Sequence, residues 1–126
     1  MTNAQALAKL IDNAPELAGE VMPEGYGTRS GYVVEYGVAY DEKNEPYPAE
    51  RDVDRFSLPT LFYQAVAGKL AEWLCDRDGS VRRCDDLVDG CRYCVSMGQR
   101  HGYMMLYGPT YFAALVEAAI AVHNAA

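Results

Sequence analysis

Tyrosine or valine occupies every second position from Tyr32 to Tyr40, and this strict period of two constrains the fold more than any other pattern in the chain. This period is that of a β-strand, because successive side chains point to opposite faces of a sheet. Gly37 permits a bulge or a bend within the strand. We therefore expect a half-buried strand, one face of which is formed by Tyr32, Val34, Tyr36, Val38 and Tyr40.

Three other segments repeat their apolar residues at helical spacing. The first covers residues 4–14 and continues, after Pro15, as a short piece that ends at the proline and glycines of residues 23–27. The second covers residues 58–74, and the third follows Gly108-Pro109-Thr110. The buried stripe of the second helix is expected to comprise Leu58, Leu61, Phe62, Ala65, Val66, Leu70, Trp73 and Leu74. That of the last helix comprises Phe112, Leu115, Val116, Ala119 and Ile120.

Residues 92–107 indicate a β-hairpin, since Tyr93, Val95 and Met97 alternate with smaller residues before the glycines of residues 98–102 turn the chain. Residues 41–54 are predicted as a polar loop and residues 80–90 as a mixed-charge connection. The sequence therefore predicts one α+β domain over residues 1–126. Amphipathic helices pack on an antiparallel sheet of about three or more strands, in the order α-β-α-β-β-α.

The chain is acidic, with a formal net charge of −7 and a pI near 4.7 over 126 residues. Direct binding to DNA or RNA needs a basic surface that neutralises phosphates, so we expect no nucleic-acid ligand. No apolar run approaches the roughly 20 residues of a membrane span, and no signal peptide is recognised at the N-terminus. The expected location is the cytoplasm, where cysteines stay reduced.

Four cysteines gather in one fifth of the chain, and two of them form the motif Cys91-Arg-Tyr-Cys94. Zinc in structural sites takes four such ligands, often supplied as two CxxC pairs, but only one pair is present here. The alternative is a set of buried, reduced thiols that act as small hydrophobic side chains. The sequence leaves both open for Cys75, Cys84, Cys91 and Cys94.

A second group of residues could hold a nucleotide or a phosphorylated metabolite, because arginine offers a bidentate fork to phosphate and tyrosine stacks on a base. Aspartates interleave with these arginines, which also fits a solvated salt-bridge surface. The candidates for this ligand site are Arg82, Arg83, Arg92, Tyr93, Arg100 and His101.

The most acidic stretch of the chain is the predicted loop over residues 41–54, and tyrosine is unusually frequent, with ten residues. Tyrosine is favoured in protein interfaces because it joins apolar area to a hydroxyl group. An open tyrosine face also predicts a homodimer. The residues expected to contact a protein partner are Asp41, Glu42, Glu45, Glu50, Asp52, Asp54, Tyr32, Tyr36 and Tyr40.

Residues 58–124 combine a helix, the hairpin around Tyr93-Cys94-Val95-Ser96-Met97 and the closing segment Gly108-Pro109-Thr110-Tyr111-Phe112. This order of elements resembles the small phage or prophage proteins described as ABA sandwich domains. The resemblance implies a small accessory protein of phage origin, and it implies no catalytic residues.

Catalytic motifs are scarce. The sequence has no Gly-x-Ser-x-Gly elbow, and only His101 and His123 could serve as a histidine base. The predicted hairpin would bring Cys94 near His101, and this Cys–His pair is the one candidate for an activated nucleophile. We therefore expect a non-enzymatic binding protein, acting as an inhibitor of a basic, nucleic-acid-binding host protein. The alternatives are the small-ligand site and a zinc-stabilised module.

Overall fold

The computed structural model describes residues 1–37, 39–47, 49–84, 90–98 and 105–125. The elements follow in the order α1 (Asn3–Asn13), α2 (Pro15–Glu20), β1 (Tyr26–Arg29), β2 (Tyr32–Tyr36), β3 (Ala39–Tyr40), β4 (Pro46–Tyr47), β5 (Glu50–Val53), α3 (Thr60–Cys75), β6 (Gly79–Arg83), β7 (Tyr93–Met97), β8 (Met105–Gly108) and α4 (Tyr111–Ala125).

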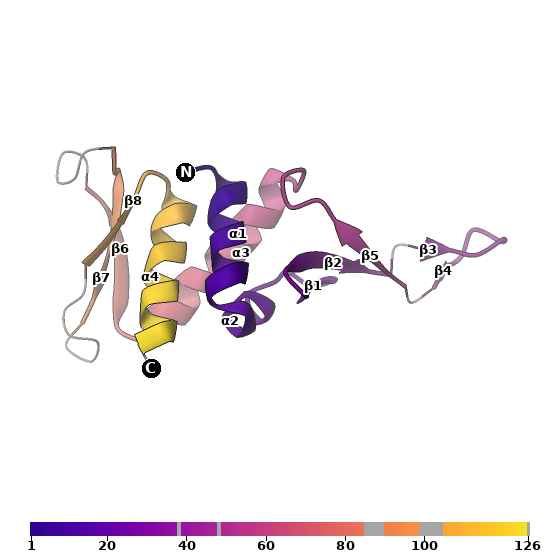
Figure 1. Ribbon diagram of the computed structural model, residues 1–126, viewed down its shortest axis with the longest axis horizontal. Helices are drawn as coiled ribbons and strands as arrows, with labels where there is room; N and C mark the ends of the chain where they lie inside the picture. The colour runs from indigo at the N-terminus through magenta and orange to yellow at the C-terminus, as the bar shows by residue number, and fades with distance from the viewer. Residues whose placement is uncertain (38, 48, 85–89, 99–104, 126) are drawn as a thin grey trace.

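The helices form a middle layer with an antiparallel sheet on either side of it (Figure 1). One sheet has the strand order β6-β7-β8 and packs against α3 and α4. The other has the order β1-β2-β5 and reaches the helices through the edge-to-face contact of Tyr26 with Phe62, whose ring centroids are 5.0 Å apart. The predicted α+β class with antiparallel pairing is confirmed.

Residues 32–53 form a long hairpin arm that projects away from the helices (Figure 1). Near the body its sides are β2 and β5, paired from Val33↔Val53 to Tyr36↔Glu50, and further out they are β3 and β4. Gly37 lies between β2 and β3 with a φ of 74°, a left-handed conformation that glycine adopts without steric cost. The bend expected at Gly37 is therefore present.

Two segments predicted as connections contain strands. The acidic segment 41–54 holds β4 and β5, and the mixed-charge segment 80–90 holds most of β6, so the predicted order lacks several strands. Cross-strand ion pairs offset the polar composition of β5: Arg51 Nη2 lies 2.8 Å from Glu35 Oε2. The hairpin predicted over 92–107 is confirmed as β7 paired with β8, and its turn lies outside the described residues.

Apolar side chains of α1, α3 and α4 make most of the core, and no polar or charged side chain of the described part of the chain is fully buried. Leu7, Leu70 and Val116 are completely shielded from solvent. The ring of Tyr63 packs edge-to-face on those of Phe62 and Phe112. No helix of the described residues is long and apolar enough to cross a membrane.

Candidate functional site

The tip of the hairpin arm is the turn formed by residues 41–45, and all five of its residues are exposed. The carboxylate of Asp41 accepts hydrogen bonds from the backbone N–H groups of Lys43 and Glu45, each at 2.9 Å. Asn44 has a φ of 62°, a conformation that asparagine tolerates in turns. Asp41 thus shapes the turn, while Glu42 and Glu45 have no ion-pair or hydrogen-bond partner for their side chains among the described residues.

The outer face of the sheet β1-β2-β5 collects four of the predicted partner-binding residues. Tyr36 lies opposite Glu50, and Asp52 lies opposite Val34, so the strand register puts these side chains on one face with Tyr32. The exposed fractions are 59% for Tyr32 and 49% for Tyr36, so this tyrosine face is open to solvent. Tyr40, the third predicted tyrosine, lies further out along the arm in β3.

Arg29 organises this outer face. Its guanidinium forms ion pairs with Glu50 and, at 2.9 Å, with Asp52, reaching from β1 across β2 to β5. Val34 lies on the same face and is fully buried. Because Glu50 and Asp52 pair with Arg29, these two predicted acidic contacts carry less free negative charge than the sequence suggests.

At the base of the arm, Asp54 stabilises the link to α3. Its carboxylate accepts hydrogen bonds from the Phe56 N–H at 2.9 Å and from the Ser57 hydroxyl at 3.1 Å. The sequence pattern does not reveal two exposed apolar side chains beside this link, Phe56 with 67% and Leu61 with 75% of their surface exposed. The prediction that Leu61 and Ala65 belong to the buried stripe of α3 is wrong, because both lie on the exposed side of the helix, as does Gly68.

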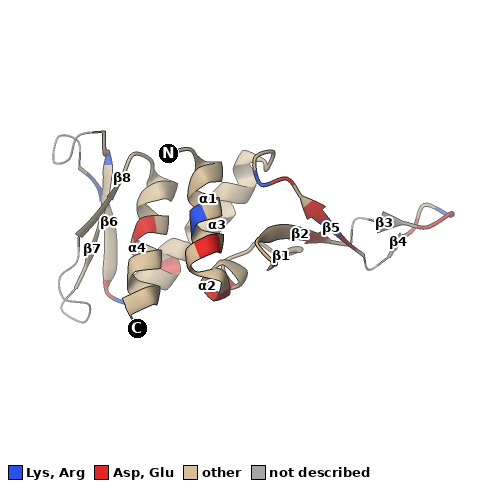
Figure 2. Cartoon of the chain, viewed as in Figure 1, with Lys and Arg blue, Asp and Glu red and all other residues tan. Residues whose placement is uncertain are grey.

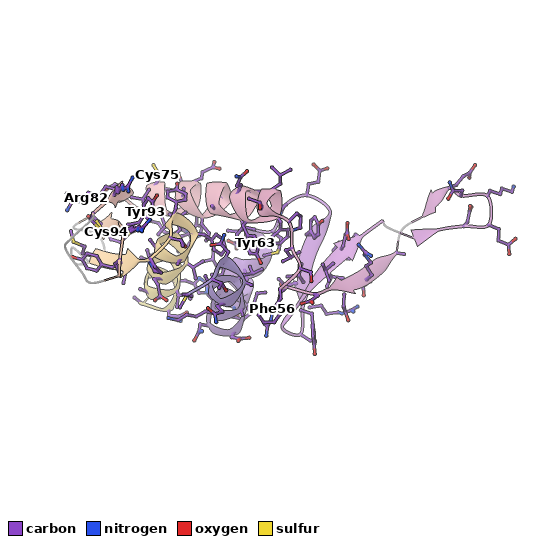
Figure 3. The ribbon with its side chains drawn as sticks, turned by 90° about the horizontal axis from the view of Figure 1, so that it is seen from above. Phe56, Tyr63, Cys75, Arg82, Tyr93 and Cys94 are labelled. Carbon is purple, nitrogen blue, oxygen red and sulfur yellow. The ribbon has the colours of Figure 1, made fainter. Side chains whose placement is uncertain are left out.

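The sheet β6-β7-β8 has an outer face that no described helix covers, and it carries the thiols of Cys84 and Cys94. Arg82 lies opposite Cys94, and its Nε donates a hydrogen bond to Cys94 Sγ at 3.3 Å (Figure 3). This contact, with the charges of neighbouring groups, raises the pKa of Arg82. Burial raises the pKa of the Cys84 thiol, and a hydrogen bond with the Cys94 thiol raises it further.

The predicted arginine site is divided between the two faces of this sheet. Arg82 shares the outer face with Cys94, whereas Arg83 and Tyr93, which lie opposite each other, belong to the face that meets the helices. The Tyr93 ring packs edge-to-face on Tyr111 of α4, with 5.9 Å between centroids. Arg92 is exposed next to β7, and Arg100 and His101 lie outside the described residues.

The four cysteines are all free, and the structure does not gather them. Cys75 ends α3 (Figure 3). With Leu74, Val81 and Leu115 it lines an apolar pocket of about 300 Å³. Cys94 lies on the opposite face of the sheet from Val81. Within the described ranges, no group of three or more Cys, His, Asp or Glu side chains is arranged to hold a metal ion. The zinc site predicted as an alternative for the four thiols stays a prediction.

Comparison with protein-family models, with curated proteins and with solved structures finds no match for this chain. The fold and the surface features define a small α+β protein with a layer of helices between two sheets. Its two distinctive surfaces are the hairpin arm and the thiol-bearing face of the second sheet.

Proposed function

We propose that this chain is a non-enzymatic binding protein that docks the tip of its hairpin arm on a basic surface of a partner protein. In the setting that the phage resemblance implies, the partner is a nucleic-acid-binding protein of the host, such as a defence protein. The arm then acts as an inhibitor by occupying the surface that nucleic acid would use.

The observation that carries the proposal is the difference in role among the carboxylates of residues 41–45. Asp41 directs its hydrogen bonds to the backbone of the turn and so fixes its shape. Glu42 and Glu45 lie in this turn at the far end of the arm, with Lys43 between them, and Figure 2 shows acidic and basic residues together there. A fixed turn loses little backbone conformational entropy on binding, and its exposed charges steer an oppositely charged partner toward them.

Tyr32 and Tyr36 supply the apolar part of the proposed contact. Their open face continues along the same arm, and tyrosine contributes contact area with few rotatable bonds. Glu50 and Asp52, which pair with Arg29 on that face, are expected to set the orientation of the partner more than its affinity.

The test compares three baits in a pull-down from a bacterial lysate. The arm variant carries Glu42→Gln and Glu45→Gln, which remove two charges but keep the shape of the turn. The matched control carries Asp12→Asn and Glu24→Gln, two exposed carboxylates of the body.

We expect wild type and the control to retain the same basic proteins, and the arm variant to lose them. A DNA duplex should compete for these partners. Salt at 1 M should release them, because it shortens the screening length to about 3 Å. Identical retention by all three baits would refute the role of the tip.

A further inference from the structure

We infer that Cys84 and Cys94 form a redox-active dithiol, which small disulfides of the glutathione type convert reversibly into an intramolecular disulfide. This site is separate from the hairpin arm, and it does not depend on the binding function proposed above.

The strand register brings the two thiols together. Cys94 in β7 lies opposite Arg82, and the backbone N–H of Cys84 donates to the carbonyl of Arg92 at 2.8 Å, so the pairing of the two strands continues beyond Arg83. Cys84 and Cys94 are therefore diagonal neighbours on one face of the sheet, and Arg82, which contacts Cys94 Sγ, lies on the same face.

The backbone allows the small adjustment that a disulfide needs. Diagonal neighbours in an antiparallel pair have Cα atoms about 7 Å apart, whereas a disulfide prefers about 5.5 Å. Cys84 follows the last residue of β6, and one backbone hydrogen bond, to the Arg92 carbonyl, ties it to the neighbouring strand, so the adjustment involves the end of the sheet and not its centre.

Arg82 makes the exchange chemistry favourable. Its Nε–H contacts Cys94 Sγ at 3.3 Å and stabilises negative charge that develops on this sulfur when it attacks or leaves. Cys84 and Cys94 are only 6% and 0% exposed, which hinders direct attack on a small disulfide. Cys91 is partly exposed and directly precedes Arg92, whose carbonyl accepts from the Cys84 N–H, so it is the accessible thiol beside the buried pair.

The exchange balances in three steps. The Cys91 thiolate attacks a small disulfide RSSR, whose S–S bond breaks and releases RS⁻. The Cys84 thiolate then attacks Cys91 Sγ and expels the second RS⁻. Finally the Cys94 thiolate attacks Cys84 Sγ and returns Cys91 to its thiolate form. Overall, two protein thiols and RSSR yield one protein disulfide and two RSH, and a small thiol in excess reverses the sequence.

The experiment incubates reduced protein with glutathione disulfide, blocks the remaining thiols with iodoacetamide and maps the products by mass spectrometry. Wild type should yield a peptide pair joined through Cys84 and Cys94. Cys91→Ser should reach the same product about tenfold more slowly, because access to the first thiol is lost. Cys75→Ser serves as the matched control and should behave as wild type.

Two outcomes would overturn the inference. One is a final disulfide that joins Cys91 to either neighbour. The other is the absence of any peptide pair joined through Cys84 and Cys94 after exposure to excess glutathione disulfide. Because both outcomes are measured on the wild-type protein, a substitution that failed to fold would leave them unaffected.

Discussion

Gly108 is the position at which one added methyl group should cost the most. The residue ends β8 and is buried against the first turn of α4. A Cβ placed on it would lie 2.4 Å from the backbone nitrogen of Ala114 and 2.9 Å from the carbonyl carbon of Ala113. An ordinary contact begins near 3.4 Å, so Gly108→Ala requires the strand and the helix to separate by about 1 Å.

The expected loss follows from this displacement. The atoms in the way belong to backbone and cannot rotate aside, which puts the cost near the upper part of the overpacking range, about 3 kcal/mol. Gly→Ala also restricts the unfolded chain, which offsets about 0.5 kcal/mol. We therefore expect a net loss in the free energy of unfolding of about 2.5 kcal/mol, equivalent to roughly 10 °C in Tm for a chain of this length.

Urea denaturation followed by circular dichroism measures this difference. The matched control is Gly68→Ala in the middle of α3, where an added Cβ would meet no atom within 4 Å. In an exposed helical position the same substitution should stabilise the protein by about 0.5–1 kcal/mol. Equal unfolding midpoints for Gly108→Ala and wild type would refute the tight packing of β8 on α4.

Three further predictions concern the core and the surface. Leu70→Ala removes a fully buried side chain and should lower the free energy of unfolding by roughly 3 kcal/mol, and a urea midpoint near that of wild type would contradict it. Tyr63→Phe removes the hydroxyl that donates to the Arg55 carbonyl at 2.9 Å and should cost about 1 kcal/mol by thermal denaturation, whereas no change would show that water replaces this bond. The pKa of Glu16 is lowered first by a backbone hydrogen bond and then by His123, so its contribution to stability is present above the ordinary carboxyl pKa and fades as the pH falls through the lowered value. NMR titration should show that His123→Ala restores the Glu16 pKa only in part, and a full return to the ordinary value would be inconsistent with the backbone contact.

The sequence predicts the elements whose pattern is apolar and local. The helices and the pairing of β7 with β8 follow from periodicity, because their buried residues repeat at 3.6 or 2 positions. The strand β5 reads Glu50-Arg51-Asp52-Val53, which no hydrophobic pattern reveals. Its charges are accommodated by Glu35 and Arg29, which are 16 and 23 residues away from their partners in the sequence. The strand β6 likewise shows no hydrophobic pattern, because Val81 is its one large apolar residue.

Alternation also predicts which residues share a face, but not which face is covered. Tyr32 and Tyr36 do share one face, yet the helices cover the other one, where Val33 joins the core. The covered face is decided by tertiary contacts such as that of Tyr26 with Phe62, which the pattern of a single strand does not contain. Likewise, composition gives the number of acidic residues, but their roles come from the structure. The carboxylate of Asp41 accepts backbone hydrogen bonds that hold the turn, whereas the side chain of Glu42 has no partner among the described residues.

The hairpin arm is continuous in sequence, and the hydrogen bonds of residues 41–45 stay within the turn itself. Turns of this kind tolerate insertion and substitution, because little of the remaining structure depends on them. Changes in the length or charge of the tip would therefore leave the folding of the helices and of the second sheet largely untouched. Sequence change at the tip and maintenance of a stable core can thus act on different residues.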